Sequence, residues 1–147
     1  EGHRGTAAEI ISRPAYLDLP PELVERGLTG RMTVSARGEI RETPGFVSFN
    51  EGAASFPWKS LAALFAQRLA LAHGLDPQDA GVRAMGHFRT DLYRRHLRPA
   101  GAPLPGASQR IEGALSADRT VAAERGSMIL RADGFFDGMT FDPAAVG

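Results

Sequence analysis

The sequence predicts a mainly α-helical segment with a few short strands, and three observations support this. Its composition is that of a globular protein, with 43% hydrophobic and 23% charged residues over 147 positions. Helix start and stop signals recur along the chain, and the stretch after Ser55 repeats apolar residues every three or four positions. The segments 31–54 and 127–143 instead set apolar residues among Gly, Pro, Asn and Asp, as short strands and turns do.

Two short helices are expected in the first 30 residues. Thr6 and Glu9 have the spacing of a capping box, so a first helix should follow and end before Pro14. A second helix should begin at the Pro-Pro pair that follows and stop at Gly27 or Gly30.

The strongest predicted element is a helix that begins at Ser55 and ends at Gly74. Serine is a good helix cap, and Pro57 is tolerated in a first turn. The apolar positions with helical spacing are Trp58, Leu61, Leu64, Phe65, Leu69 and Ala72. This spacing predicts one apolar helix face.

Two more helices are expected, one from Asp76-Pro77 and one capped by Thr90 and stopped at Pro99. In the latter, Leu92 and Leu97 should face the core. Further along, Asp137-Gly138 lies between "FF" and "MTF" and predicts a tight hairpin turn.

Charge and motif content exclude several function classes. Seventeen basic residues balance seventeen acidic ones, so any anion site must be local. There is no cysteine, and the four histidines have no metal-site spacing. No apolar run approaches the roughly 18 to 20 residues of a membrane span, so no membrane insertion is expected. Without a G-x-S-x-G motif, a phosphate loop or a thiol nucleophile, nothing supports an enzyme or a cofactor.

The stretch "SFPWKS" holds the only tryptophan, Trp58, and the only lysine, Lys59. A helix N-terminus carries partial positive charge and free N–H groups, so these two donors could complete a site for a small oxyanion. Alternatively, Trp58 lies in the core and Lys59 in solvent. The residues alone favour this second interpretation.

A group of arginines lies in and before the predicted helix from Thr90, namely Arg89, Arg94, Arg95 and Arg98. At helical spacing the last three cover one side, which could bind phosphate or simply be solvated. Because no aromatic residues alternate with them, the solvated face is favoured and no direct nucleic-acid binding is expected.

Four segments together resemble a known family. They are "SRPAYLDLPPELVERGLTGR", "FVSFNEGAASFPWKSLAALFAQRLA", "HFRTDLYRRHLRPAGAPLPGASQRIEGAL" and "DGFFDGMTFDP". In this order they are similar to the C-terminal third of the nitrate/bicarbonate solute-binding proteins. That family includes the binding subunits of nitrate-type ABC transporters and the related nitrate sensors of bacterial nitrate assimilation.

The resemblance implies an α/β fold of the type II periplasmic-binding kind for the parent protein, with two lobes that close over a small oxyanion. Residues 1–147 would be the C-terminal segment of that fold. The chain opens on Glu1 without a methionine, which agrees with a processed or truncated chain.

The resemblance also implies roles for particular residues. Trp58 and Lys59 match the aromatic-basic pair of the family's "F-P-W-[KR]-S" motif and are the implied ligand-binding residues. The residues that match the motifs "R-x-D-L-Y" and "F-F-D-G-x-x-F-D-P" are expected to be structural, and they include Arg89, Asp91, Tyr93, Phe136, Asp137, Gly138, Asp142 and Pro143. The segment after "FPWKS" departs from the family because Phe65 is its only aromatic residue before Gly74.

The two branches of the family imply different partners. An importer subunit would be periplasmic and dock on an ABC permease, whereas a sensor would be cytoplasmic and hold an antiterminator protein until nitrate or nitrite binds. The sequences "LPGASQRIEGAL" and "GFFDG" are somewhat closer to those of the sensor branch. The alternative function is a stand-alone helical protein-interaction module without a small ligand.

Overall fold

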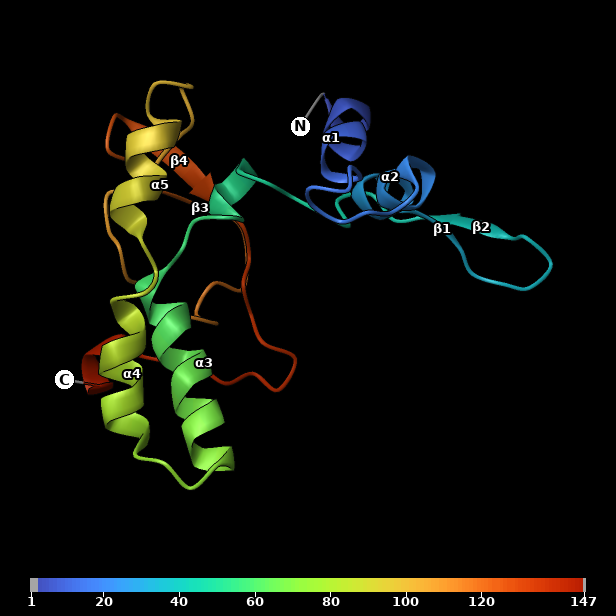
Figure 1. Cartoon of the computed structure of the whole chain (residues 1–147). Helices are drawn as coiled ribbons and strands as arrows, with labels where there is room; N and C mark the ends of the chain where they lie inside the picture. Colours follow the sequence, from blue (N-terminus) through green and yellow to red (C-terminus); the bar gives the residue numbers. More distant parts are fainter. Residues whose placement is uncertain (1–2, 147) are drawn as a thin grey trace. The chain divides into compact units, whose positions relative to one another are not determined.

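The computed structural model describes residues 3–146, which fall into two units of the chain (Figure 1). Unit 1 covers Glu1–Phe49 and unit 2 covers Asn50–Gly147. Each unit combines helices with one two-stranded antiparallel hairpin. No helix in the described part of the chain is long and apolar enough to cross a membrane.

Unit 1 consists of two helices followed by a hairpin. The elements are α1 (Arg4–Ile11), α2 (Pro21–Thr29), β1 (Arg31–Thr33) and β2 (Ile40–Glu42). Both predicted helices are therefore confirmed. Gly30 ends α2 with a left-handed φ of 75°, and a side chain there would meet the Thr43 carbonyl oxygen at 2.4 Å. Only glycine fits this turn.

The predicted capping box at the start of α1 is wrong. The helix begins two residues before Thr6, with His3 at the N-cap and no side-chain cap. The Arg4 guanidinium donates to the carbonyl oxygen of Leu28 and, at 2.8 Å, to that of Val47. These contacts with distant backbone fix the first residue of the helix within unit 1, and tertiary contacts of this kind override a local capping signal.

Unit 2 contains the other three predicted helices. They are α3 (Lys59–Ala72), α4 (Pro77–Met85) and α5 (Thr90–Leu97), with short 3₁₀ turns η1 (Glu51–Ala53) and η2 (Pro143–Val146). Helices α3 and α4 pack side by side, and η2 lies against them (Figure 1). The start of α4 is confirmed, since the Asp76 carboxylate accepts from the Gln78 N–H at 2.8 Å.

The predicted caps of α3 and α5 are wrong. Helix α3 starts after Trp58 rather than at Ser55, whose hydroxyl instead bonds the Tyr93 hydroxyl at 2.9 Å. Helix α5 has Arg89 at the N-cap, and Thr90 is buried inside the helix start. In both places the side chain expected to cap is engaged in, or buried by, tertiary packing.

A second hairpin, β3 (Arg119–Ala122) and β4 (Ser127–Leu130), was not predicted. Met128 and Leu130 of β4 are buried, while Ile129 between them is exposed. The predicted hairpin at Asp137-Gly138 is wrong: the chain turns there, but no strands flank the turn. Instead, Phe141 makes an antiparallel bridge to Glu112.

The core of unit 2 lies where α5, β4 and the start of α3 meet. Its buried members are Ala53, Phe56, Trp58, Met128 and Leu130. The Phe56 ring meets the Trp58 ring edge-on at a centroid distance of 4.7 Å and the Tyr93 ring at 5.3 Å. Trp58 is only 4% exposed, so its predicted place in the core is confirmed.

Helix α5 buries a different face from the predicted one. Leu92 is 38% exposed, whereas the Arg94 side chain is only 15% exposed. The Arg94 guanidinium donates to the Ser108 hydroxyl and to two carbonyl oxygens, at 2.8 to 3.0 Å. It also lies 5.0 Å from the centre of the Phe56 ring. Arg94 is therefore a structural residue, and its predicted solvated position is wrong.

Candidate functional site

The candidate site is the N-terminus of α3, where the sequence places Trp58 and Lys59. Trp58 is the N-cap, with extended backbone angles, and Lys59 and Ser60 are the first two helical residues. Phe56 and Trp58 turn into the core while Lys59 stays half-buried at the surface. The local sequence thus puts a core aromatic and a surface cation next to each other.

Most of the free N–H groups of this helix end already have protein acceptors. The Lys59 N–H donates to the Ser108 carbonyl oxygen at 3.0 Å. The N–H groups of Leu61 and Ala62 both point to the Trp58 carbonyl oxygen, at 3.0 and 3.3 Å. The backbone at the start of α3 is therefore not an open anion site by itself.

A buried carboxylate, Glu112, lies at this positive helix end. Its side chain is 1% exposed. One carboxylate oxygen accepts from the Ser60 hydroxyl, and the other accepts from Arg110 Nε at 3.0 Å. A negative charge next to a helix N-terminus is stabilised by the helix dipole. Glu112 therefore supplies, from within the chain, the anion that this end of α3 favours.

Arg110 joins the carboxylate to the core. Its guanidinium lies 4.8 Å from the centre of the Trp58 ring, and its backbone N–H donates to the Ser60 hydroxyl at 3.2 Å. The guanidinium also pairs with Asp133 Oδ2 at 3.1 Å. That oxygen is fully buried and lacks a well-aligned hydrogen bond, so the contact is one of charge. We call Ser60, Arg110, Glu112 and Asp133 the buried charge cluster.

Sequence reasoning missed the buried charge cluster. Arg110 and Glu112 lie in a segment without helix or strand periodicity, and nothing in the sequence around Ser60 indicates a distant carboxylate partner. The only available indication is that a charged residue sits between Ile111 and Gly113. A side chain at Gly113 would meet the Met139 carbonyl oxygen and the Phe135 ring, both at 2.6 Å. Phe135 and Met139 thus pack closely on the residue that follows Glu112.

Two donors at the site remain without an acceptor in the described part of the chain. One is the ammonium of Lys59, which makes no ion pair with any described carboxylate, and the other is the indole N–H of Trp58. Both belong to the pair that the sequence singles out. Lys59 is partly exposed and can donate to a molecule at the surface, whereas Trp58 is only 4% exposed and could donate only to a molecule that reaches the core.

The "R-x-D-L-Y" residues have structural contacts. Arg89 and Asp91 form an exposed double hydrogen bond at 2.8 and 2.6 Å. The hydrogen bond from Arg89 holds the pKa of the Asp91 carboxyl well below its usual range, and Asp91 raises the pKa of Arg89. Tyr93 packs on the core and holds Ser55.

The residues of the closing motif form two turns. Asp137 accepts from the Met139 N–H at 3.1 Å, and Gly138 has a left-handed φ of 70°. Asp142 accepts from the Ala144 N–H at 2.9 Å and so caps η2, which begins at Pro143. Phe136 is fully exposed at the tip of the first turn. The structure brings Trp58 and Tyr93 into one core but leaves Phe136 outside it.

No protein-family model, curated protein or solved structure matches this chain. The described residues hold no group of three or more side chains arranged to bind a metal ion.

Proposed function

We propose that residues 1–147 are the C-terminal segment of a two-lobed solute-binding protein of the α/β type II periplasmic-binding kind. In this proposal the parent protein binds nitrate or nitrite without catalysing a reaction. One observation carries the proposal: the unpaired donors Trp58 Nε1 and Lys59 Nζ both flank the start of α3, at the motif that resembles the family's aromatic-basic pair. A small oxyanion accepts hydrogen bonds from such donors, and the rest of its site would come from the other part of the parent protein.

The packing of the motif segments supports the same proposal. Trp58 from "FPWKS" and Tyr93 from "R-x-D-L-Y" both pack against Phe56 or its neighbours in one core. The closing motif reaches this region too, because Phe141 pairs with Glu112, whose carboxylate holds Ser60. Segments that are far apart in the sequence thus meet around the start of α3.

Exposed apolar side chains also support a larger parent fold. Several large apolar residues on and between α3 and α4 are about half exposed or more, and they are Phe65, Leu69, Leu71, Leu75 and Val82. Exposed patches of this kind mark interfaces in soluble proteins. Their burial against the rest of the parent protein would remove them from water.

The proposed mechanism is a population shift. Nitrate is planar, singly charged and weakly hydrated, so selectivity comes from the geometry of the donors rather than from charge alone. The anion stabilises the closed arrangement of the lobes. A partner protein then binds the closed form and the open form with different affinity. That partner is an ABC permease for a periplasmic importer subunit or an antiterminator protein for a cytoplasmic sensor in nitrate assimilation.

Calorimetric titration of the parent protein with nitrate, nitrite and bicarbonate tests the proposal. We expect saturable heat with nitrate or nitrite. Lys59→Ala should weaken that binding by about tenfold, or about 1.4 kcal/mol, because it removes one charged donor. The matched control Arg83→Ala removes an exposed cation of α4 and should leave the affinity unchanged. No heat with any anion would contradict the proposal, and unchanged affinity in Lys59→Ala would make Lys59 structural.

A stand-alone interaction module is the second candidate, and the separate core of unit 2 favours it. It predicts that residues 1–147 melt cooperatively and that nitrate leaves the melt unchanged. The oxyanion proposal predicts instead that the isolated segment is unstable, or becomes stable only with its missing lobes. Thermal melting of the segment alone and within the parent protein separates the two.

A further inference from the structure

A groove with charged walls lies between the end of α5 and the β3–β4 turn. Its volume is about 290 Å³. It is lined by Arg98, Gly101, Ala102, Pro103, Leu104, Glu124 and Arg125. Leu104 is buried and, with Pro103, provides an apolar surface inside the groove. None of these residues belongs to the site at the start of α3.

Glu124 fixes the orientation of the arginine on one wall. Its carboxylate pairs with Arg94 Nε at 2.7 Å and with Arg98 Nη2 at 2.8 Å. Two guanidinium groups therefore share one carboxylate, and a positive charge is left over. The Nη1 group of Arg98 makes no hydrogen bond within residues 3–146, so it is free to donate to a ligand.

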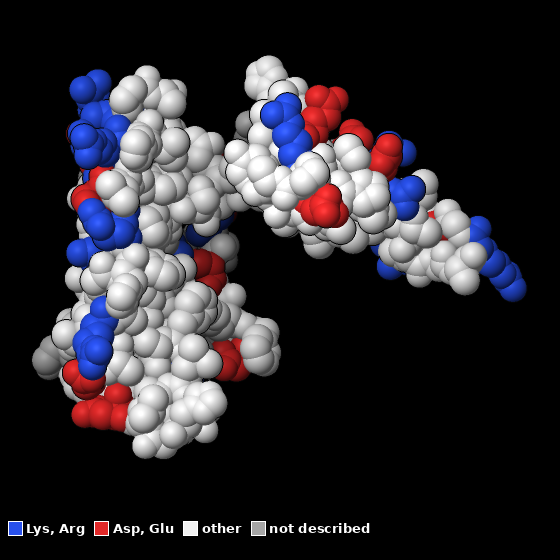
Figure 2. Space-filling view, in the orientation of Figure 1, with Lys and Arg blue, Asp and Glu red and all other residues white. Residues whose placement is uncertain are grey.

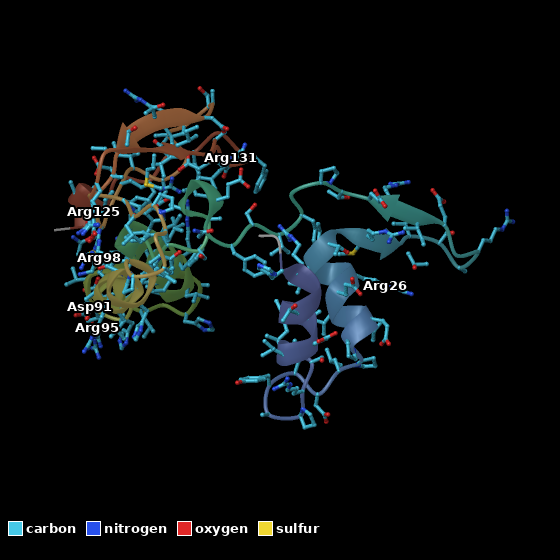
Figure 3. All side chains as sticks on the ribbon, turned by 90° about the horizontal axis from the view of Figure 1, so that it is seen from above. Arg26, Asp91, Arg95, Arg98, Arg125 and Arg131 are labelled. Atoms are coloured by element: carbon cyan, nitrogen blue, oxygen red, sulfur yellow. The ribbon has the colours of Figure 1, made fainter. Side chains whose placement is uncertain are left out.

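Two more cations extend this positive charge. Arg125, which lines the groove, and Arg95 make no ion pair in the part of the chain that the structure describes. Figure 2 shows Lys and Arg atoms gathered along the side of unit 2 that carries α5. In Figure 3 the labelled side chains of Arg95, Arg98 and Arg125 lie along the same side of this unit. We call these three residues the arginine edge.

The excess is local, because the whole chain carries no net formal charge. Ordered guanidinium groups recognise carboxylates through two parallel hydrogen bonds. The apolar surface of Pro103 and Leu104 suits the methylene groups of a peptide that runs along the groove. We propose that the arginine edge and its groove bind an acidic peptide segment, rich in Asp or Glu, on the surface of a protein partner.

The same features disfavour a nucleic acid. Binding of single strands combines cations with exposed aromatic rings on which bases stack. The Tyr93 ring of α5 is partly buried and packs against the buried Phe56 ring. This inference goes beyond the proposed function and does not depend on nitrate binding.

Fluorescence anisotropy of a labelled octaglutamate peptide with the intact protein tests the inference. We expect saturable binding that weakens as salt is added, because surface charges are screened. An octaglutamine peptide of the same length should not bind. The double variant Arg95→Glu/Arg125→Glu should weaken octaglutamate binding by about tenfold or more, because it reverses two of the three charges of the arginine edge.

The matched control is Arg37→Glu, which reverses an exposed arginine in unit 1. It should leave octaglutamate binding within about twofold of the unmodified protein. Equal losses in the control and the double variant would overturn the inference, as would no binding of octaglutamate. Tighter binding of a single-stranded oligothymidine, lost in the same double variant, would also overturn it in favour of a nucleic acid. A thermal melt checks that both variants are folded.

Discussion

Glu112 carries a charge in one of the most buried positions of unit 2. Desolvating a carboxylate costs several kcal/mol unless other groups offset that cost. Here the offsetting groups are the Ser60 hydroxyl, the Arg110 guanidinium and the positive end of α3. Trp58 shares this environment, since Arg110 stacks on its ring.

Replacing Glu112 by alanine should therefore destabilise unit 2 strongly. The variant leaves Ser60 without its acceptor and Arg110 with one carboxylate instead of two, and we expect a loss of about 3–5 kcal/mol. Urea unfolding followed by the emission of Trp58, the only tryptophan, measures it. Asp91→Asn is the control: it also removes a carboxylate paired with an arginine, but an exposed one, and should not shift the midpoint. Equal shifts would contradict the account of the buried charge cluster.

At the scale of elements, the backbone turn at Gly113 allows the closing segment to approach the cluster. The φ of Gly113 is 77°, a value that residues with a side chain rarely adopt. Phe135 and Met139 pack directly against this glycine. Gly138 has a similar φ of 70°, yet nothing lies within 4 Å of the place where its side chain would be. A substitution at Gly138 therefore introduces backbone strain alone, whereas one at Gly113 introduces both backbone strain and a steric clash.

Gly138→Ala should cost about 1–2 kcal/mol from backbone strain alone. Gly113→Ala should cost a further 1–3 kcal/mol or so, because the new methyl group overlaps Phe135 and the Met139 carbonyl. Denaturant unfolding of both variants provides the comparison. If the two losses are the same, the close packing of the closing segment on Gly113 does not contribute to stability.

Helices and caps show how far the sequence alone could predict these elements. The five helices were predicted because proline, glycine and apolar spacing are local signals, and Asp76 shows such a signal acting as expected. The starts of α3 and α5 were wrong because Ser55 and Thr90 are used by contacts with residues far away in the sequence. The β3–β4 hairpin was missed because its strands are four residues long and only one of them alternates in burial.

The candidate site was predictable only in part, for the same reason. Trp58 was placed correctly in the core from its apolar spacing. Arg94 was placed in solvent because an arginine on a short helix normally is, whereas here it satisfies carbonyl oxygens of the loop at Pro105 and Ala107. The pairing of Ser60 with Glu112, across 52 positions, leaves no local pattern at all.

At the scale of the whole molecule, the apolar surface of α3 contributes little to the described fold. Phe65 and Leu69 are 54% and 62% exposed, whereas Leu64 on the same helix is 5% exposed. The residues that this helix buries inside unit 2 are mostly small, such as Ala62 and Ala63. A surface that is apolar but unused within the unit is available for packing against other protein.

The double variant Phe65→Gln/Leu69→Gln should therefore keep the stability of the chain within about 0.5 kcal/mol. It should also reduce the binding of an apolar dye such as ANS, because less apolar surface remains exposed. Leu64→Ala is the contrasting variant and should cost about 2–5 kcal/mol. Thermal melts and dye fluorescence measure both effects. A large loss of stability in the double variant would show that this surface is already buried.

The position of Lys59 also has a practical consequence. Lys59 is the only lysine among the 147 residues and the first residue of α3. Its ammonium group has no ion-pair partner among the described residues. Within this segment, acylating reagents at alkaline pH therefore have a single side-chain target. A fluorophore attached there would sit beside the lone indole of the chain, and quenching between the two would report any rearrangement of the loop that precedes α3.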